Sequence, residues 1–533
     1  MNHRIAPSIP AISFVIWWIV PTILFPTRLL NADGDLLRRI GHGEWMLRHH
    51  SLIHADPFSF TRSGQPFVGF EYGSQLIYAL VHRAAGLAGV AIVAGLLIAV
   101  AYALLARFLL SRGTDPLLSY LTIVAAAVLG AFHWAARPHL FTLVAVVVLM
   151  FLLESTVDGR RSTGSKNPPV TPRHSTLDPR PLWALPLFAI WANLHGGFVF
   201  GLVLIGIYFT GHLLEYVLNN DRLAERQEMN YFARLFGFGF LGTLLNPHFL
   251  ALHRHVLGLF GQPFLLDNTN EFMSPDFHHL FGKILLGALL GMIALLACLP
   301  RRPHAAHLLT LLAMTYFVLT AQRNIQLFGV TAVPIMAMLL DTHWRGLPDW
   351  RGIRTVFQRD APLGRTTPYV LAMVALFGFL AVGSGQIAGK QVIPNAVSAE
   401  VFPVAVVRRA RAEQLQGRIY HSFIWGGYLI YAWPEQKVFI DGGTDFYGTD
   451  LLKNYMAIGG LAPGWRDSLT QWNISLALVQ PGSSLAHELL REPGWRLHDC
   501  DATAALLQKA GGASERSVAD SLLGACESRG AER

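Results

Sequence analysis

The feature that most constrains this chain is a series of long segments without a charged side chain. Four of them extend over residues 5–27, 84–106, 116–136 and 366–389. Each is long enough to cross roughly 30 Å of hydrocarbon as an α-helix. Hydrophobic residues make up 52% of the 533 residues and charged residues only 14%, which is unusual for a soluble protein. We therefore expect a polytopic α-helical membrane protein.

Seven further spans complete the predicted membrane domain. An uncharged segment at 181–214 is too long for one crossing and is interrupted by His195-Gly196-Gly197, so we divide it into two spans there. This division brings the predicted total to about eleven. The other five spans are shorter uncharged segments, at 138–153, 235–253, 284–300, 303–322 and 324–340.

The distribution of basic residues predicts how the spans are oriented. With eleven spans, five Arg-rich loops share one side of the membrane, and loops of this kind remain in the cytoplasm. We therefore expect a cytoplasmic N-terminus and an extracytoplasmic C-terminus. The net charge is +8, but the basic residues lie mainly in short loops between spans, where they set the orientation of the chain. We therefore expect no nucleic-acid partner. The five loops are 107–115, 155–181, 219–234, 301–302 and 343–365.

Composition divides the chain into three parts. Residues 1–390 form the predicted transmembrane domain, with an external loop at 31–83 and a Pro- and Ser-rich cytoplasmic linker at 155–181. Residues 391–510 are expected to fold as a small extracytoplasmic α/β domain. The tail at 511–533, which is rich in Gly, Ser, Ala and charge, is predicted to be mobile.

The predicted C-terminal domain has strand-like runs at 417–421, 437–441 and 474–480. The second run ends in Asp441 and continues into Gly442-Gly443-Thr444-Asp445, a position that serves either ligand binding or support of the fold. No GxGxxG pattern follows, so no nucleotide cofactor is expected.

Three cysteines occur, without the Cys and His spacing of a metal site. Cys298 lies in a predicted span, whereas Cys500 and Cys526 can pair if their region faces an oxidising compartment.

The external loop at 31–83 carries the most informative polar residues. Asp33 and Asp35 stand just beyond the predicted membrane edge, where a carboxylate can act as a general base or bind a divalent cation. The alternative is that one of them caps a helix predicted over 36–49. Glu71 is either a second acidic group of the site or a cap at the membrane interface.

Several strings in the chain resemble a bacterial family related to the GT-C class of membrane glycosyltransferases. The resemblance extends over most of the chain and includes the external loop after the first span. The class contains protein O-mannosyltransferases, lipid A aminoarabinose transferases and the catalytic subunits of oligosaccharyltransferases. The strings are Asp33-Gly34-Asp35-Leu36, Asp56-Pro57-Phe58-Ser59, Trp191-Ala192-Asn193-Leu194-His195-Gly196-Gly197-Phe198 and Gly426-Gly427-Tyr428-Leu429.

The resemblance implies an enzyme that takes a sugar from a polyprenyl-phosphate carrier in the bacterial cytoplasmic membrane. Its acceptor is an envelope glycan, a lipid or a protein. The resemblance implies that a first-loop aspartate activates the acceptor, and Asp35 is the first choice because it begins the predicted helix, with Asp33 second. If a divalent cation is needed, these two are the expected ligands. Asp56 is included among the substrate-binding candidates on the same resemblance.

Basic residues are expected to hold the lipid phosphate. Arg137 and Arg323 stand at the external ends of otherwise uncharged spans, where a guanidinium can contact phosphate oxygens or extend to ordinary phospholipid headgroups. Asn193 and His195 end the fifth predicted span, where they serve either phosphate binding and proton transfer or a tight turn at the glycines.

Two other functions fit a polytopic chain. The first is a transporter or flippase, which would concentrate ionisable groups in the middle of the membrane and show inverted repeats. The chain instead carries its acids in an external loop. The second is a non-catalytic envelope scaffold, which would not depend on Asp33 or Asp35.

Overall fold

The computed structural model describes residues 7–31, 34–154, 178–218, 222–259, 261–349, 352–355, 366–509, 523, 524 and 526. Asp33, nearly all of the predicted linker at 155–181 and most of the predicted tail lie outside these residues. The chain forms two compact units. The helical unit comprises Met1–Phe25, Ile92–His253 and Leu266–Val382, and the mixed unit comprises Pro26–Ala91, Arg254–Leu265 and Gly383–Arg533. The predicted domain boundary at residue 390 stays a prediction.

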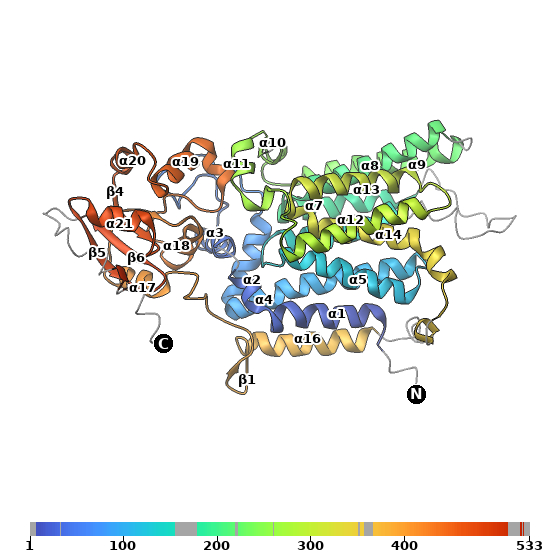
Figure 1. The fold of residues 1–533 in the computed structure, drawn as a ribbon, viewed down its shortest axis with the longest axis horizontal. Coiled ribbons are helices and arrows are strands. Elements are labelled where there is room, and N and C mark those ends of the chain that lie inside the picture. The colour runs from blue at the N-terminus through green and yellow to red at the C-terminus, as the bar shows by residue number, and fades with distance from the viewer. Residues whose placement is uncertain are drawn as a thin grey trace. The chain divides into compact units, whose positions relative to one another are not determined.

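The helical unit consists of apolar helices that pack along one another (Figure 1). Each of the eleven predicted spans overlaps one of them. Within the described residues, five helices are long and apolar enough to cross a membrane, so the polytopic character is confirmed and the count of eleven stays a prediction. The helices are α1 (Ile9–Ile19), α4 (Tyr72–Ser111, shared with the mixed unit), α5 (Pro116–Gly130), α6 (His139–Leu153), α7 (Ala184–Leu194), α8 (Phe198–Leu218), α9 (Arg222–Thr243), α12 (Leu280–Cys298), α13 (Ala305–Thr320), α14 (Ile325–Gly346) and α16 (Thr367–Val382).

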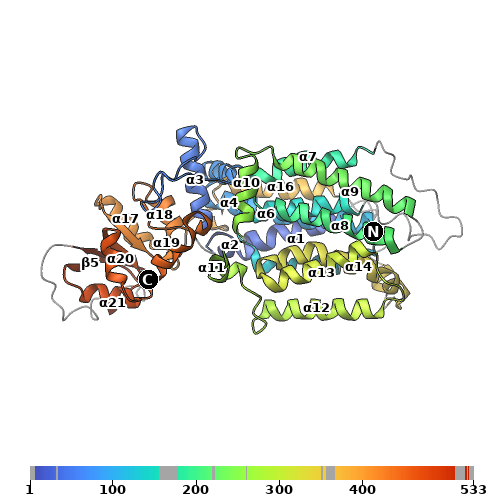
Figure 2. The ribbon, with the colours of Figure 1, turned by 90° about the horizontal axis from the view of Figure 1, so that it is seen from above.

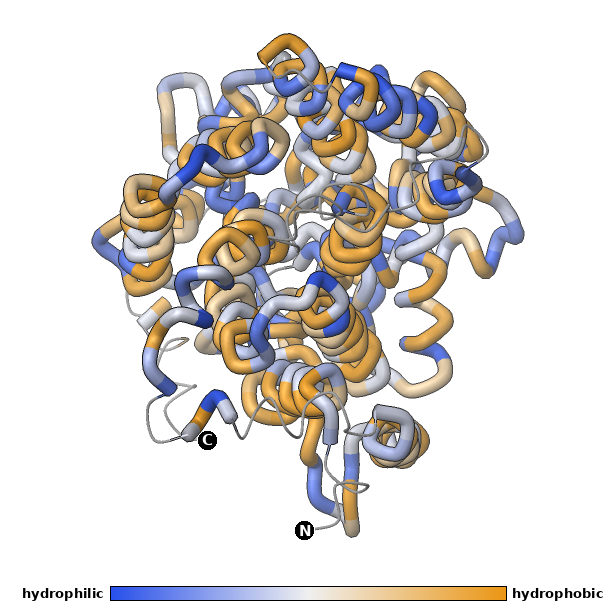
Figure 3. Tube along the Cα trace, turned by 90° about the vertical axis from the view of Figure 1, so that its right-hand side faces the viewer, coloured by the Kyte–Doolittle hydropathy of each residue, from blue (hydrophilic) through white to orange (hydrophobic). Residues whose placement is uncertain are grey.

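The helices of this unit keep apolar side chains on their outer faces. Figure 2 shows α12 at the edge of the unit, and its side chains Leu286, Leu290 and Ile293 are exposed. Along the chain, the helical segments are mainly hydrophobic and the connections between them mainly hydrophilic (Figure 3). Apolar surface of this kind is stable only in contact with lipid or protein, as expected of membrane spans.

The predicted break at residues 195–197 is present, because α7 ends at Leu194 and α8 begins at Phe198. The predicted loop at 219–234 is wrong in its described part, since α9 starts at Arg222. No Pro or Gly interrupts residues 222–235, so the helix continues into the charged stretch. The polar residues at the start of α9 therefore extend the helix beyond its apolar part.

The mixed unit contains a four-stranded sheet with the order β3-β4-β6-β5. Strands β3 and β4 are parallel, and the other neighbours are antiparallel. Helices cover the sheet, and Ile458, Leu489 and Leu507 lie in the resulting core. The strands are β3 (Arg418–His421), β4 (Ile474–Val479), β5 (Trp495–Cys500) and β6 (Ala505–Lys509), besides a hairpin of β1 (Gln386–Ile387) and β2 (Lys390–Gln391). The helices are α2 (Pro26–Leu30), α3 (Asp35–His49), α10 (Leu250–Leu259) and α11 (Pro263–Asp267) in part, α17 (Val404–Ala412), α18 (Gly426–Ala432), α19 (Thr444–Gly459), α20 (Trp465–Gln471) and α21 (Ser484–Arg491).

Two predicted strands are confirmed in β3 and β4, and the third, at 437–441, is wrong. Among the described residues this segment belongs to no sheet, and it bends at Phe439. Its Val438 forms one parallel bridge to Ser59, and the N–H of Phe439 donates to Nε2 of His421 instead of to a neighbouring strand. A ring nitrogen therefore takes the place of a strand partner. The predicted pairing of Cys500 and Cys526 is present as a disulfide.

Helices α3 and α18 approach so closely that only glycine fits between them. A Cβ on Gly34 would lie 2.2 Å from the carbonyl oxygen of Ile424, and a Cβ on Gly427 would lie 2.1 Å from the carbonyl oxygen of Gly34. Two of the strings that carry the family resemblance therefore pack directly on each other. This contact fixes the start of α3, which bears the charged residues of the site.

Candidate functional site: a charged cluster at the start of helix α3

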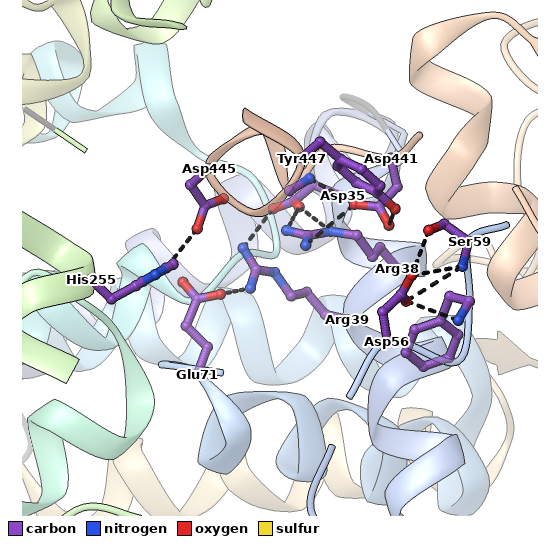
Figure 4. Close-up of polar contacts among 12 residues, drawn as sticks. Asp35, Arg38, Arg39, Asp56, Ser59, Glu71, His255, Asp441, Asp445 and Tyr447 are labelled. Atoms are coloured by element: carbon purple, nitrogen blue, oxygen red, sulfur yellow. Dashed lines mark hydrogen bonds and ion pairs between the residues drawn. The ribbon is translucent and has the colours of Figure 1, made fainter. Parts of the chain in front are cut away.

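One face of helix α3 carries ionisable residues from its first turn onward. Asp35, Arg38, Arg39 and His42 follow the spacing that brings side chains to the same side of a helix. Asp35 stands in the first turn, where the helix dipole favours a negative charge. The side chains of Arg38 and Arg39 are only 8% and 10% exposed. Buried guanidinium groups require acidic partners, and these come from several segments of the mixed unit (Figure 4).

Asp35 is held by both arginines. Its Oδ1 accepts from Nε and Nη2 of Arg38 at 3.1 and 2.7 Å, and its Oδ2 accepts from Nη2 of Arg39 at 3.3 Å. Burial by itself would raise the pKa of Asp35, but Arg39 and Arg38 together hold this pKa well below its usual range. The carboxylate is therefore ionised at neutral pH and has low affinity for a proton.

Two further carboxylates complete the surroundings of the arginines. Arg39 forms an ion pair with Glu71, the residue before α4. Nη1 of Arg38 lies 3.6 Å from Oδ1 of Asp441. Both acids are almost fully buried, so each guanidinium is shared between two segments of the chain.

Asp441 differs from Asp35 in its electrostatic environment. It accepts from the N–H of Gly443 at 2.7 Å and from the hydroxyl of Tyr447 at 2.9 Å. Burial nevertheless raises the pKa of Asp441 above its usual value, with Arg38 acting in the opposite direction. Within one cluster, Asp35 therefore favours its charged form and Asp441 retains its proton more readily.

A carboxylate and an imidazole form the most accessible pair of the cluster. Nε2 of His255, on α10, lies 2.8 Å from Oδ2 of Asp445, in the first turn of α19. Their side chains are 21% and 22% exposed. Burial would raise the pKa of Asp445, but His255 and then Arg38 and Arg39 lower it. Asp445 can therefore orient the imidazole, whose second nitrogen can exchange a proton with a substrate.

The cluster contains more acids than guanidinium groups among the described residues: Asp35, Glu71, Asp441 and Asp445 lie around Arg38 and Arg39. Among the described residues these acids form no set of three ligands close enough to hold one metal ion. The divalent cation expected from the sequence stays a prediction, since Asp33 is outside the described part of the chain.

The predicted candidate Asp56 has a different environment. Its carboxylate accepts from the N–H groups of Phe58 and Ser59 and from the hydroxyl of Ser59. Phe58 in turn stacks on His42, with ring centres 4.3 Å apart. These contacts stabilise the turn beside α3, so the motif Asp56-Pro57-Phe58-Ser59 supports the charged face.

The arginines predicted to bind phosphate lie in the helical unit, and Glu271 connects them. Arg137 forms an ion pair with Glu271, and the guanidinium of Arg323 lies 4.7 Å from the ring centre of Phe272, the next residue. Burial would raise the pKa of Glu271, but Arg137, His133 and Arg323 lower it. Two arginines around one carboxylate leave net positive charge, which suits a phosphate.

His195 is engaged in the turn between α7 and α8, and Asn193 lies in the last turn of α7. Nδ1 of His195 accepts from the N–H of Gly197 at 3.1 Å and lies 2.7 Å from the hydroxyl of Thr142. The amide of Asn193 donates to the carbonyl groups of Ala189 and Leu245. The contacts of His195 favour its turn interpretation, whereas those of Asn193 join α7 to a residue that follows α9.

Sequence reasoning missed Arg38, Arg39 and His255. A signal for the first two was present, because Asp35, Arg38, Arg39 and His42 follow helical spacing on a helix that was itself predicted. His255 gave no such signal, since its partner Asp445 is far away in the sequence.

Comparison with known proteins identifies the fold. No protein-family model and no curated protein matches this chain. The structure is similar to the archaeal oligosaccharyltransferase AglB from Archaeoglobus fulgidus in complex with an inhibitory peptide and a dolichol-phosphate. The TM-score is 0.53, the sequence identity 12%, and the match covers 89% of this chain and 69% of that one.

Two further structures extend the comparison. The Archaeoglobus fulgidus oligosaccharyltransferase tethered to an acceptor peptide with the NVT sequon matches with a TM-score of 0.52 at 14% identity, over 89% of this chain and 68% of that one. ArnT from Cupriavidus metallidurans, bound to undecaprenyl phosphate, covers 95% and 98% at 12% identity, but its TM-score of 0.46 is too low to establish a common fold. The sequence-based resemblance is confirmed for the fold: the chain folds like the archaeal oligosaccharyltransferase.

Proposed function

We propose that this protein is a glycosyltransferase that moves a sugar from a polyprenyl-phosphate-linked donor to an envelope glycan, lipid or protein. The observation that carries the proposal is a buried ionic cluster, begun by Asp35 on α3, in a chain with an oligosaccharyltransferase fold. Among the similar structures, AglB is complexed with a dolichol-phosphate. A lipid-linked donor needs no nucleotide pocket, in keeping with the lack of a GxGxxG pattern in the segment that follows Asp441.

The acceptor is activated by the cluster of the mixed unit. In the reaction, an acceptor oxygen or nitrogen attacks the anomeric carbon, and the bond from that carbon to the phosphate oxygen breaks. His255, oriented by Asp445, takes the proton of the acceptor. Asp35, which Arg38 and Arg39 keep ionised, attracts and orients the acceptor through its charge.

The leaving group is the polyprenyl phosphate, which departs with the electron pair of the broken bond. Arg137 and Arg323 of the helical unit bind its phosphate through their guanidinium groups. Until the donor binds, Glu271 partly neutralises the charge of these arginines through its ion pair with Arg137.

The reaction takes place at the outer face of the cytoplasmic membrane. Two features support this location: the Arg-rich loops predicted to be cytoplasmic, and the disulfide between Cys500 and Cys526, a bond that persists in oxidising compartments.

The test is transfer by the purified full-length protein from labelled polyprenyl-phosphate sugars to a panel of glycan, lipid and peptide acceptors. We expect transfer by the wild type and severe loss in Asp35→Asn and His255→Gln. Asp499→Asn is the matched control, because it removes an ion-paired aspartate of the same unit that lies outside the cluster. No transfer from any donor, or equal transfer by all three variants, would contradict the proposal. Movement of the labelled lipid across vesicles without transfer would favour a flippase.

A further inference from the structure

The ends of three helices in the helical unit bring together a group of metal-ligating side chains apart from the site described above. His212 lies near the end of α8, Glu225 in the first turn of α9, and His304 directly before α13. One ligand atom from each lies within 4.8 Å of the other two. Helix α8 packs against both α9 and α13 (Figure 1). It is the one group of this kind among the residues that the structure describes.

The imidazole of His212 has an arrangement typical of a metal ligand. Its Nδ1 lies 2.8 Å from Oε2 of Glu225, and both side chains are at most 3% exposed. Its Nε2 is buried and has no hydrogen-bond partner in the described part of the chain. A cation bound by both His212 and Glu225 would lie at Nδ1, which faces the carboxylate, and would replace the proton between them.

The neighbours of His304 in the sequence make contacts that hold it close to His212 and Glu225. Glu215 accepts from Arg302 at 2.6 and 2.8 Å and from the N–H of Ala305 at 2.8 Å. At Gly211, a Cβ would lie 2.3 Å from the Cα of Ala306, so the start of α13 lies directly on α8. The position of His304 is therefore determined before any ion binds, as in a preorganised site.

The ring of His304 offers a lone pair close to His212. The centres of the two imidazole rings are 4.6 Å apart. Nδ1 of His304 accepts from the N–H of Ala306 at 3.2 Å, so this nitrogen carries no proton. The hydrogen bond is at the long end of the usual range. A cation can therefore displace the N–H and take the lone pair without first removing a proton from the ring.

We propose that His212, Glu225 and His304 bind one transition-metal ion of the Zn²⁺ type that joins α8, α9 and α13. Two imidazoles and one carboxylate suit Zn²⁺ far better than Mg²⁺ or Ca²⁺, which prefer oxygen ligands. This inference is independent of the transferase proposal, because its test measures metal and not activity.

The test uses tag-free full-length protein in detergent, stripped with a chelator and dialysed against Zn²⁺ or Co²⁺. We expect about one Zn²⁺ per chain by mass spectrometry and, with Co²⁺, the visible absorption of a low-coordinate complex. His304→Asn is the informative variant, because the Asn side chain can still accept from the N–H of Ala306 and cap α13 but has no imidazole nitrogen. It should weaken binding at least about tenfold.

Two more variants show whether any loss of metal is specific to these ligands. Glu225→Gln keeps a side-chain oxygen for the N–H of His212 and should also weaken binding. His278→Asn, which changes an exposed histidine of the same unit, should bind like the wild type. A metal-free wild type after dialysis, or full binding by both His304→Asn and Glu225→Gln, would overturn the inference.

Discussion

Nε2 of His255 and Oδ2 of Asp445 lie 2.8 Å apart, although 190 positions separate the two residues in the chain. The pair forms an accessible acid–base unit beside Arg38 and Arg39, whose charges help to keep Asp445 ionised. A carboxylate that orients an imidazole in this way is a recurrent device for proton transfer.

His255→Gln should lower the turnover of sugar transfer by about 10²–10⁴-fold while leaving KM for the donor nearly unchanged. The reason is that glutamine fills a similar space but cannot take the acceptor proton. The measurement is steady-state transfer with saturating acceptor. His498→Gln serves as the control, since His498, on β5, pairs with Glu413 outside the cluster. Full turnover by His255→Gln would show that another group takes the proton of the acceptor.

Arg39→Gln should destabilise the mixed unit by about 3–5 kcal/mol, because it removes the guanidinium that pairs with buried Glu71 and one of the two that pair with Asp35. Thermal or urea unfolding followed by tryptophan fluorescence measures the loss. The double variant Arg39→Gln, Glu71→Gln should lose less than the sum of the single changes. Arg411→Gln, which removes an exposed ion pair with Glu435, should change stability by less than about 1 kcal/mol. Strict additivity would show that the pair is not coupled.

Acid should weaken the fold through Asp35 and Asp445. Both have a pKa that is lowered in the folded state, so the unfolded chain binds more protons than the folded one. Their stabilisation is full above the unfolded value of about 4 and is lost as the pH falls through the lower, folded pKa.

The free energy of unfolding of the wild type should therefore decrease more steeply on acidification than that of Asp35→Asn. Asp441→Asn should alter the slope in the opposite direction, since the pKa of Asp441 is raised on folding. The same slope in wild type and Asp35→Asn would contradict the assigned ion pairs.

Cys526→Ser should lower the stability of the mixed unit by about 3 kcal/mol, since it opens the loop that the disulfide to Cys500 closes. Thermal unfolding with and without a reducing agent measures the effect. Cys298→Ser should have little effect, because Cys298 is a free and exposed cysteine. Insensitivity of the wild type to reduction would show that the disulfide does not contribute.

Arg137→Gln should weaken binding of polyprenyl phosphate, and Glu271→Gln should strengthen it severalfold at low salt. Both follow from the net positive charge that two arginines and one carboxylate produce. Fluorescence titration with a short-chain polyprenyl phosphate measures both. Arg345→Gln, which removes another ion-paired arginine of the helical unit, is the control. Weaker binding after Glu271→Gln would place the phosphate elsewhere.

Local patterns in the sequence predict much of the fold. Uncharged runs identify the helices of the helical unit, and Gly196-Gly197 marks the break between α7 and α8. The helix predicted over 36–49 is confirmed as α3. These features depend on residues close together in the chain, which is why periodicity and composition are sufficient for them.

Long-range pairing accounts for what the sequence does not reveal. Arg38 contacts Asp441, and no local pattern links residues some four hundred positions apart. The segment at 437–441 has the composition of a strand, but the ring of His421 takes the N–H that a neighbouring strand would need. The charged start of α9 was predicted to be a loop because hydropathy counts charge and ignores helix propensity.

The backbone contact between Gly34 and Gly427 restricts how this protein can change over evolutionary time. Neither position has room for a methyl group, so no single substitution at one of them can be accommodated by a rearranged side chain at the other. Substitution of the neighbouring charged residues changes the chemistry of the cluster, whereas substitution of either glycine would shift α3 as a whole. The pair therefore marks where sequence diversity should be lowest among homologues of this chain.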